Sequence, residues 1–149
     1  MAEFNYESLI TRKITRDTIY PPFLNMIFHA QKDHNFQIRF THVSVPFEGK
    51  EDAHKHEFAQ VFLFVPCTPD LNAYDAETHL YLGDEGKHIV INETCAVFVP
   101  ANMTHCPIIH KRVGTPFFFV NCPMTGEYSA IVDGKKQAIP VRNMKIPGK

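Results

Sequence analysis

Short β-prone runs, each ended by Gly, Pro, Asp or Asn, follow one another from Phe36 onward. Runs of this length with turn residues between them are typical of a β-sandwich or a closed barrel. No stretch has the sustained 3.6-residue apolar period of a helix, so helix is expected only as a minority. We therefore predict an all-β chain with strands at 36–45, 58–65, 77–82, 87–92, 95–100 and 116–121.

The length of 149 residues fits one ordinary domain, and no linker or repeat divides the chain. We expect a single domain over 1–149, with a core at about 36–121, a peripheral N-terminal arm at 1–35 and C-terminal strands at 122–149. Pro21-Pro22 is expected to stop regular structure in the arm. Asp133-Gly134 lies between two short apolar segments and predicts a hairpin or an outer strand.

Charge and composition exclude several partners. Lys and Arg number 15 against 16 Asp and Glu, with no basic block of the kind that a phosphate backbone demands. The first residues, MAEFNYESLITRK, have neither the basic n-region nor the apolar h-region of a secretion signal. No apolar run approaches the ~20 residues that span a bilayer. Four cysteines without a CxxC pair are typical of free thiols in a reducing compartment. We expect a cytoplasmic protein without a nucleic-acid or membrane partner.

The stretch AHKHEFAQVFLF, at 53–64, carries the chemistry. On a regular strand His54, His56 and Gln60 share one face, and two histidines two residues apart, at roughly 6 to 7 Å, can turn to one cation. Gln60 reaches the same point only if the strand bends. A further ligand must come from elsewhere, and the best candidate is His105, which follows a strand and a tight turn in VPANMTH. The pattern predicts a metal site.

These two stretches resemble the two motifs of the cupin superfamily. HKHEFAQ is similar to the first motif, HxHx3E, and VPANMTH to the second, PxGxxH, over about half of the chain (48–120). The resemblance implies a small β-barrel, the double-stranded β-helix or jelly roll. It also implies one divalent metal ion (Fe, Mn, Zn or Ni) held inside the barrel by His54, His56, Gln60 and His105.

The chain departs from the cupin motifs at four positions. Asn102 replaces a Gly, which is a mild change because Asn tolerates left-handed backbone. Gly49 is one residue too close to His54, and Cys67 stands where the first motif ends in Gly. Gln60 replaces the Glu. As a ligand, a neutral amide predicts weaker metal retention and a stronger Lewis acid; as a neighbour, it would instead hydrogen-bond to a ligated histidine.

The segment between the motifs returns through Glu77. If this carboxylate faces inward it can act as a general base or proton shuttle, or restore the charge that Gln60 lacks. The opposite strand parity would send it to solvent. Cys106, next to His105, is expected to be a buried structural thiol, because adjacent residues on an extended chain point apart.

The resemblance implies a family of many chemistries, and a fold does not select one. We expect a metal-dependent enzyme acting on an organic acid or related oxygenated metabolite, by Lewis-acid isomerisation, hydrolysis or elimination, or by dioxygenase chemistry if the metal is iron. The alternative is a non-catalytic module that binds a metal or ligand, and a weaker one is a structural oligomer. We expect a homodimer, with the N-terminal arm as a candidate swapped strand.

Overall fold

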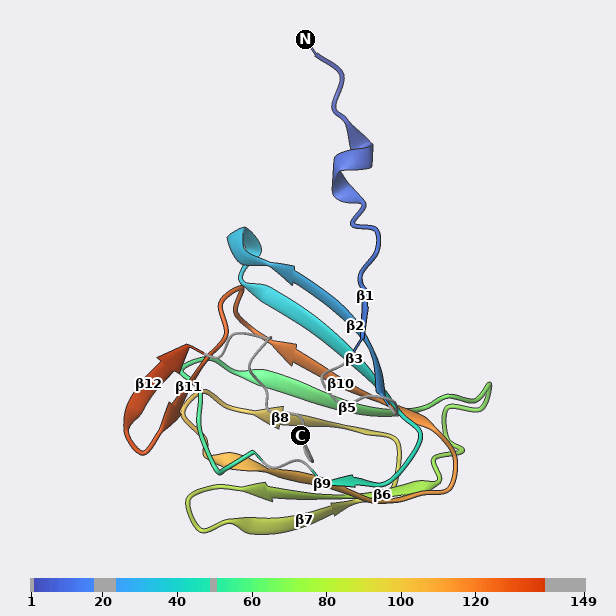
Figure 1. Ribbon diagram of the computed structural model, residues 1–149, viewed down its shortest axis with the longest axis vertical. Helices are drawn as coiled ribbons and strands as arrows, with labels where there is room; N and C mark the ends of the chain where they lie inside the picture. The colour runs from blue at the N-terminus through green and yellow to red at the C-terminus, as the bar shows by residue number, and fades with distance from the viewer. Residues whose placement is uncertain (1, 18–23, 49–50, 139–149) are drawn as a thin grey trace.

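The computed structural model describes residues 2–17, 24–48 and 51–138 (Figure 1). The prediction of an all-β chain is confirmed, because the described elements are strands apart from two short 3-10 helices, η1 (Tyr6–Leu9) and η2 (Lys32–His34). In the described part of the chain, no helix has the length and apolarity needed to cross a membrane.

Two antiparallel sheets and a hairpin contain the strands. The larger sheet has the order β1-β2-β3-β10-β5-β8, the smaller has β4-β9-β6-β7, and β11 pairs with β12. The bounds are β1 (Thr15–Asp17), β2 (Leu24–Gln31), β3 (Phe36–Val43), β4 (Phe47–Glu48), β5 (Gln60–Pro66), β6 (Ala76–Leu82), β7 (Lys87–Ile91), β8 (Cys95–Val99), β9 (His105–Val113), β10 (Phe117–Pro123), β11 (Ser129–Val132) and β12 (Lys135–Ala138).

Strand parity places the hydrophobic core between the two sheets. Along β5 every second residue is buried, beginning with Gln60 and continuing through Phe62 and Phe64. These rings pack in one cluster with Leu80 from β6 and Phe117 from β10. Complete burial of each ring contributes about 1.5–3 kcal/mol. The interior face of β5 is therefore apolar along most of its length and becomes polar at Gln60.

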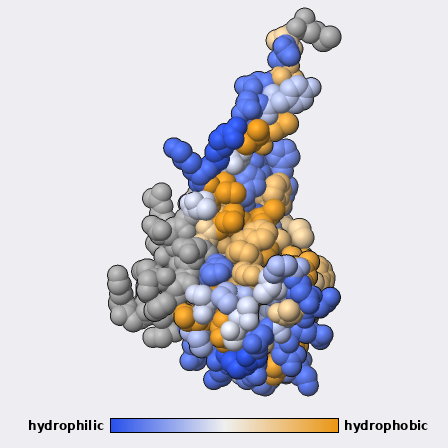
Figure 2. All heavy atoms as spheres, turned by 90° about the vertical axis from the view of Figure 1, so that its right-hand side faces the viewer, coloured by the Kyte–Doolittle hydropathy of each residue, from blue (hydrophilic) through white to orange (hydrophobic). Residues whose placement is uncertain are grey.

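The N-terminal segment divides into two parts. β2 pairs with β3 along its whole length, from Leu24↔Val43 to Gln31↔Phe36, so it belongs to the larger sheet. The peripheral arm therefore ends earlier than the predicted residue 35. η1 and the residues beside it project away from the sheets (Figures 1 and 2), and their apolar side chains are exposed. Pro21-Pro22 lies outside the described residues.

The C-terminal hairpin is confirmed at the predicted turn. β11 and β12 pair from Ser129↔Ala138 to Val132↔Lys135, so two residues connect them. Asp133 and Gly134 have φ values of 49° and 74°, and a tight hairpin turn of this kind needs left-handed backbone at both positions. The predicted C-terminal strands beyond residue 138 lie outside the described residues.

Candidate metal centre

Main-chain hydrogen bonds bring the two motifs together. His54 forms an isolated antiparallel bridge with His105, and the two N–O distances are 3.0 and 2.8 Å. The N–H of Asn102 also donates to the carbonyl of His56 at 2.6 Å. Asn102 has φ = 65°, the left-handed backbone that the Gly of the cupin motif would provide. The turn of the second motif is thus fastened to the first motif.

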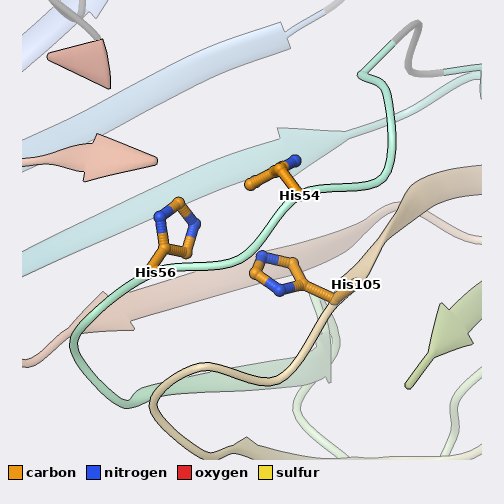
Figure 3. A group of neighbouring side chains, drawn as sticks. All are labelled: His54, His56 and His105. Carbon is orange, nitrogen blue, oxygen red and sulfur yellow. The ribbon is translucent and has the colours of Figure 1, made fainter. Parts of the chain in front are cut away.

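The three predicted histidines form one buried cluster (Figure 3). Their exposed fractions are 8% for His54 and 2% for both His56 and His105. The ring centroids lie 4.5 to 4.9 Å apart, and one nitrogen from each ring lies within 4.8 Å of the others. The structure therefore contains a possible three-histidine metal site.

Each of the three imidazoles is oriented by a main-chain carbonyl. A carbonyl can only accept a hydrogen bond, so the Nδ1 atom beside it carries the proton and Nε2 keeps its lone pair. This second contact fixes the tautomer and the direction of a metal-binding histidine. The Nδ1 atoms of His54, His56 and His105 donate to Asp52, Ser129 and Met103 at 2.7, 2.6 and 3.0 Å.

Burial keeps two of the rings, His56 and His105, neutral. It lowers the pKa of His56 to about 3, against the opposing contact with Ser129 and with smaller contributions from the neighbouring charges of His105, His54 and Arg39. Burial also lowers the pKa of His105 to about 4. A neutral imidazole is the form that binds a metal ion. Near neutral pH both rings are therefore in the metal-binding protonation state.

Gln60 joins this cluster from the first residue of β5. Its side chain is 1% exposed, and its Nε2 lies 2.8 Å from Nε2 of His105. Its Oε1 is buried without a hydrogen-bond partner. An amide can be turned by 180° at little cost in shape, which exchanges the two atoms. Gln60 is thus placed either to donate to His105 or to present an oxygen beside Nε2, and its role as a ligand stays a prediction.

Glu77 is not brought together with the histidines. Its neighbour Thr78 is fully buried, so parity along β6 directs Glu77 to the other face of the sheet. The Glu77 side chain is 41% exposed and lies 2.6 Å from Nε2 of His79, a contact that lowers its pKa. This placement does not support the predicted catalytic role.

A second possible group of ligands shares His54 with Glu51 and Cys106. Cys106 is 4% exposed, as predicted for a structural thiol, and its Sγ donates to Glu51 Oε2 at 3.5 Å. Burial raises the pKa of this thiol well above its ordinary value. Since a metal binds the thiolate, this group is less suited to a metal than the three histidines.

Sequence reasoning missed several polar side chains in the interior. Tyr128, just before β11, donates from its hydroxyl to Nε2 of His56 at 3.0 Å. The guanidinium carbon of Arg39 lies 4.1 Å from the centroid of the Tyr128 ring. His110 is 6% exposed, and its Nδ1 atom lies 2.9 Å from Oγ1 of Thr78. The alternation of FQIRF, at 36–40, is the signal that could have indicated Arg39.

Comparison with solved structures identifies the architecture. A RmlC-like cupin from Shewanella frigidimarina superposes with a TM-score of 0.51 at 16% identity, over 78% of this chain and 88% of that one. Oxalate decarboxylase from Bacillus subtilis, described with Mn(II) centres, gives 0.54 at 10% identity over 84% of this chain. This chain has the cupin fold.

The chain spans only part of the larger similar proteins. It covers 30% of the oxalate decarboxylase chain. Hydroxypropylphosphonic acid epoxidase from S. wedmorenis is 12% identical with a TM-score of 0.46, and the matched part is 67% of this chain and 49% of that one. No family model matches the sequence, and no curated protein sequence matches it. At these identities the likeness concerns the fold.

Proposed function

We propose that this cupin is a metal-dependent enzyme that acts on a small organic acid or related oxygenated metabolite. The observation that supports it is the convergence of three imidazoles, with one nitrogen of each within 4.8 Å of the others and each ring held by a main-chain carbonyl. Neutral imidazoles suit iron, zinc, nickel and copper ions. A bound divalent ion would supply Lewis acidity or, as iron, oxygen chemistry.

The surrounding residues determine what the site would favour. An amide and metal-bound imidazoles carry no charge, so these ligands would leave the full charge of a divalent ion uncompensated. Burial raises the pKa of Tyr128, so its hydroxyl keeps its proton and acts as a hydrogen-bond donor. The site therefore favours an anionic or oxygen-rich ligand, positioned by donors in the interior.

Binding without turnover is the second candidate. Gln60 stands in place of the carboxylate of the cupin motif, and Glu77 lies on the outward face of β6. Among the described acidic side chains, Glu51 is grouped with His54, but its carboxylate already accepts a hydrogen bond from the Cys106 thiol. A set of organic acids, incubated with and without oxygen, separates the two functions: product formation supports an enzyme, and stoichiometric binding alone supports the module.

Metal analysis tests the site itself. Protein purified without added metal or chelator is expected to hold about one equivalent of a divalent metal, and His54→Ala and His105→Ala are expected to lose most of it. His34→Ala is the matched control, because His34 is an exposed histidine in η2. Elemental analysis that finds equal metal in all four proteins, or none in any, would exclude the site.

We also propose a cytoplasmic homodimer with a small-molecule substrate. The support for self-association is the projecting segment beside η1, which exposes 56 to 70% of Phe4, Tyr6 and Leu9 (Figure 2). Exposed apolar side chains in one short segment are typical of a surface that another chain covers. Exchange of this segment between two copies would bury them.

A further inference from the structure

β3 turns its polar face to the interior. Gln37 and Arg39 are 3% and 8% exposed, whereas Phe36, Ile38 and Phe40 on the other face are only half-buried. Burying a charged guanidinium costs free energy, whereas burying a phenylalanine ring is favourable. The orientation of this strand therefore indicates that the interior has a use for the charge of Arg39.

The contacts of Arg39 leave part of its guanidinium unused. Nη2 donates to Oε1 of Gln37 at 2.8 Å, and the rings of Tyr128 and Phe28 lie 4.1 and 5.6 Å from Cζ. Nε is buried without a hydrogen-bond partner. Within the described residues, no carboxylate oxygen lies within 4.0 Å of the guanidinium nitrogens. No carboxylate thus touches the guanidinium directly: burial lowers the pKa of Arg39, and the charge of the Glu51 carboxylate opposes this only from a longer distance.

This donor lies beside the histidine cluster. Tyr128 contacts Arg39 through its ring and His56 through its hydroxyl, at 4.1 and 3.0 Å. On β10, Asn121 is paired directly with Arg39, so both side chains are on the interior face. Oδ1 of Asn121 is likewise buried without a partner, and Gln60 is a diagonal neighbour on β5. Unsatisfied polar atoms therefore extend from Arg39 to the histidines.

We propose that Arg39 binds the carboxylate of a small organic acid and holds that acid beside His56. The Nε–H and a neighbouring Nη–H form an edge with two donors, which matches the two oxygens of a carboxylate. Asn121 can supply a further donor, because its amide presents nitrogen instead of oxygen after a 180° turn. The inference rests on the proposed function, in which neutral ligands leave the metal charge to be balanced by a substrate anion.

Isothermal titration calorimetry on zinc-loaded full-length protein tests the inference. The probes are lactate and malonate, with lactamide and malonamide as neutral equivalents and inorganic phosphate as a second anion. We expect Arg39→Gln to weaken carboxylate binding about 10- to 100-fold, with the amides unaffected. Arg112→Gln is the control, because Arg112 is 54% exposed and paired with Asp75. It is expected to bind like the unmodified protein.

Three results would overturn the assignment: carboxylate affinity independent of Arg39, no carboxylate binding by the unmodified protein, or tighter binding of phosphate than of either carboxylate. Arg39→Lys keeps the charge but loses the paired donors, so an intermediate loss is expected, and this variant decides the matter if Arg39→Gln does not fold. Zinc content is measured on the same samples. Arg39-dependent binding without zinc would contradict the proposed function alone, and bound zinc with Arg39-independent binding would contradict this inference alone.

Discussion

Replacing Gln60 by Glu tests whether this side chain acts on the histidine cluster. The substitution keeps the shape of the side chain and places a carboxylate oxygen where Nε2 now lies, 2.8 Å from Nε2 of His105. In metal-free protein the carboxylate would accept a hydrogen bond from protonated His105. It would therefore favour the charged form of a ring that burial now keeps neutral.

The 2.8 Å separation sets the expected magnitude. Coulomb attraction at that distance is about 6 kcal/mol for an effective dielectric constant of about 20, and desolvation of the carboxylate offsets much of it. A charge-assisted hydrogen bond contributes a net of about 1.5–3 kcal/mol, and about 1.4 kcal/mol corresponds to one pKa unit. From its value of about 4, the pKa of His105 should therefore rise by about one to two units.

The assay is NMR titration of the histidine rings after removal of metal, followed by metal competition with a chromophoric chelator. Gln60→Glu is expected to raise the pKa of His105 and to retain metal more tightly. Gln37→Glu is the matched control, because this buried amide contacts Arg39 rather than a histidine. An unchanged pKa of His105 together with unchanged metal affinity would refute the argument that Gln60 acts on this site.

Two further measurements test the interior and the assembly. Burial lowers the pKa of His110 to about 4 from its ordinary 6.5, so below pH 6.5 the unfolded chain takes up this proton first. Stability is then lost as the pH falls from 6.5 towards 4. In urea denaturation, the free energy of unfolding of His110→Gln should fall by up to about 3 kcal/mol less over this pH range than that of the unmodified protein. An equal fall in both proteins would contradict the lowered pKa of His110. Light scattering should give a dimer mass that Leu9→Asp lowers, since Leu9 is 69% exposed on the projecting segment; a monomer mass for the unmodified protein would exclude the dimer.

The strand pattern of the sequence was informative where runs alternate without interruption. β5, β6, β7, β8 and β10 each lie within two residues of a predicted strand at both ends. β9 was missed because Pro107 interrupts its run HCPIIHKRV. β2 was missed because LNMIFHAQ has no clean alternation and stands next to a pair of prolines. Its strand conformation depends on pairing with β3, which no local pattern records.

Strand parity bears differently on the parts of the site. His54 and His56 do not lie in a named strand, so their burial beside Gln60 comes from the contacts of this segment, such as the bridge between His54 and His105, and not from parity. For Glu77 the strand pattern allowed both orientations, towards the interior or towards solvent. The burial of its neighbour Thr78 on β6 directs Glu77 outward. A one-residue change of register reverses every side chain of a strand, so the sequence alone could not choose between them.

The sequence by itself determined an all-β chain, a pair of histidines with a third one far along the chain, and a neutral amide in place of a carboxylate. These follow from short-range patterns, because alternation and motif spacing are properties of neighbouring residues. Only the tertiary structure decided that the main-chain carbonyl of Ser129 holds His56, and that Arg39 and Tyr128 lie beside the histidines. These contacts join residues up to 89 positions apart along the chain, so they exist only once the sheets have packed.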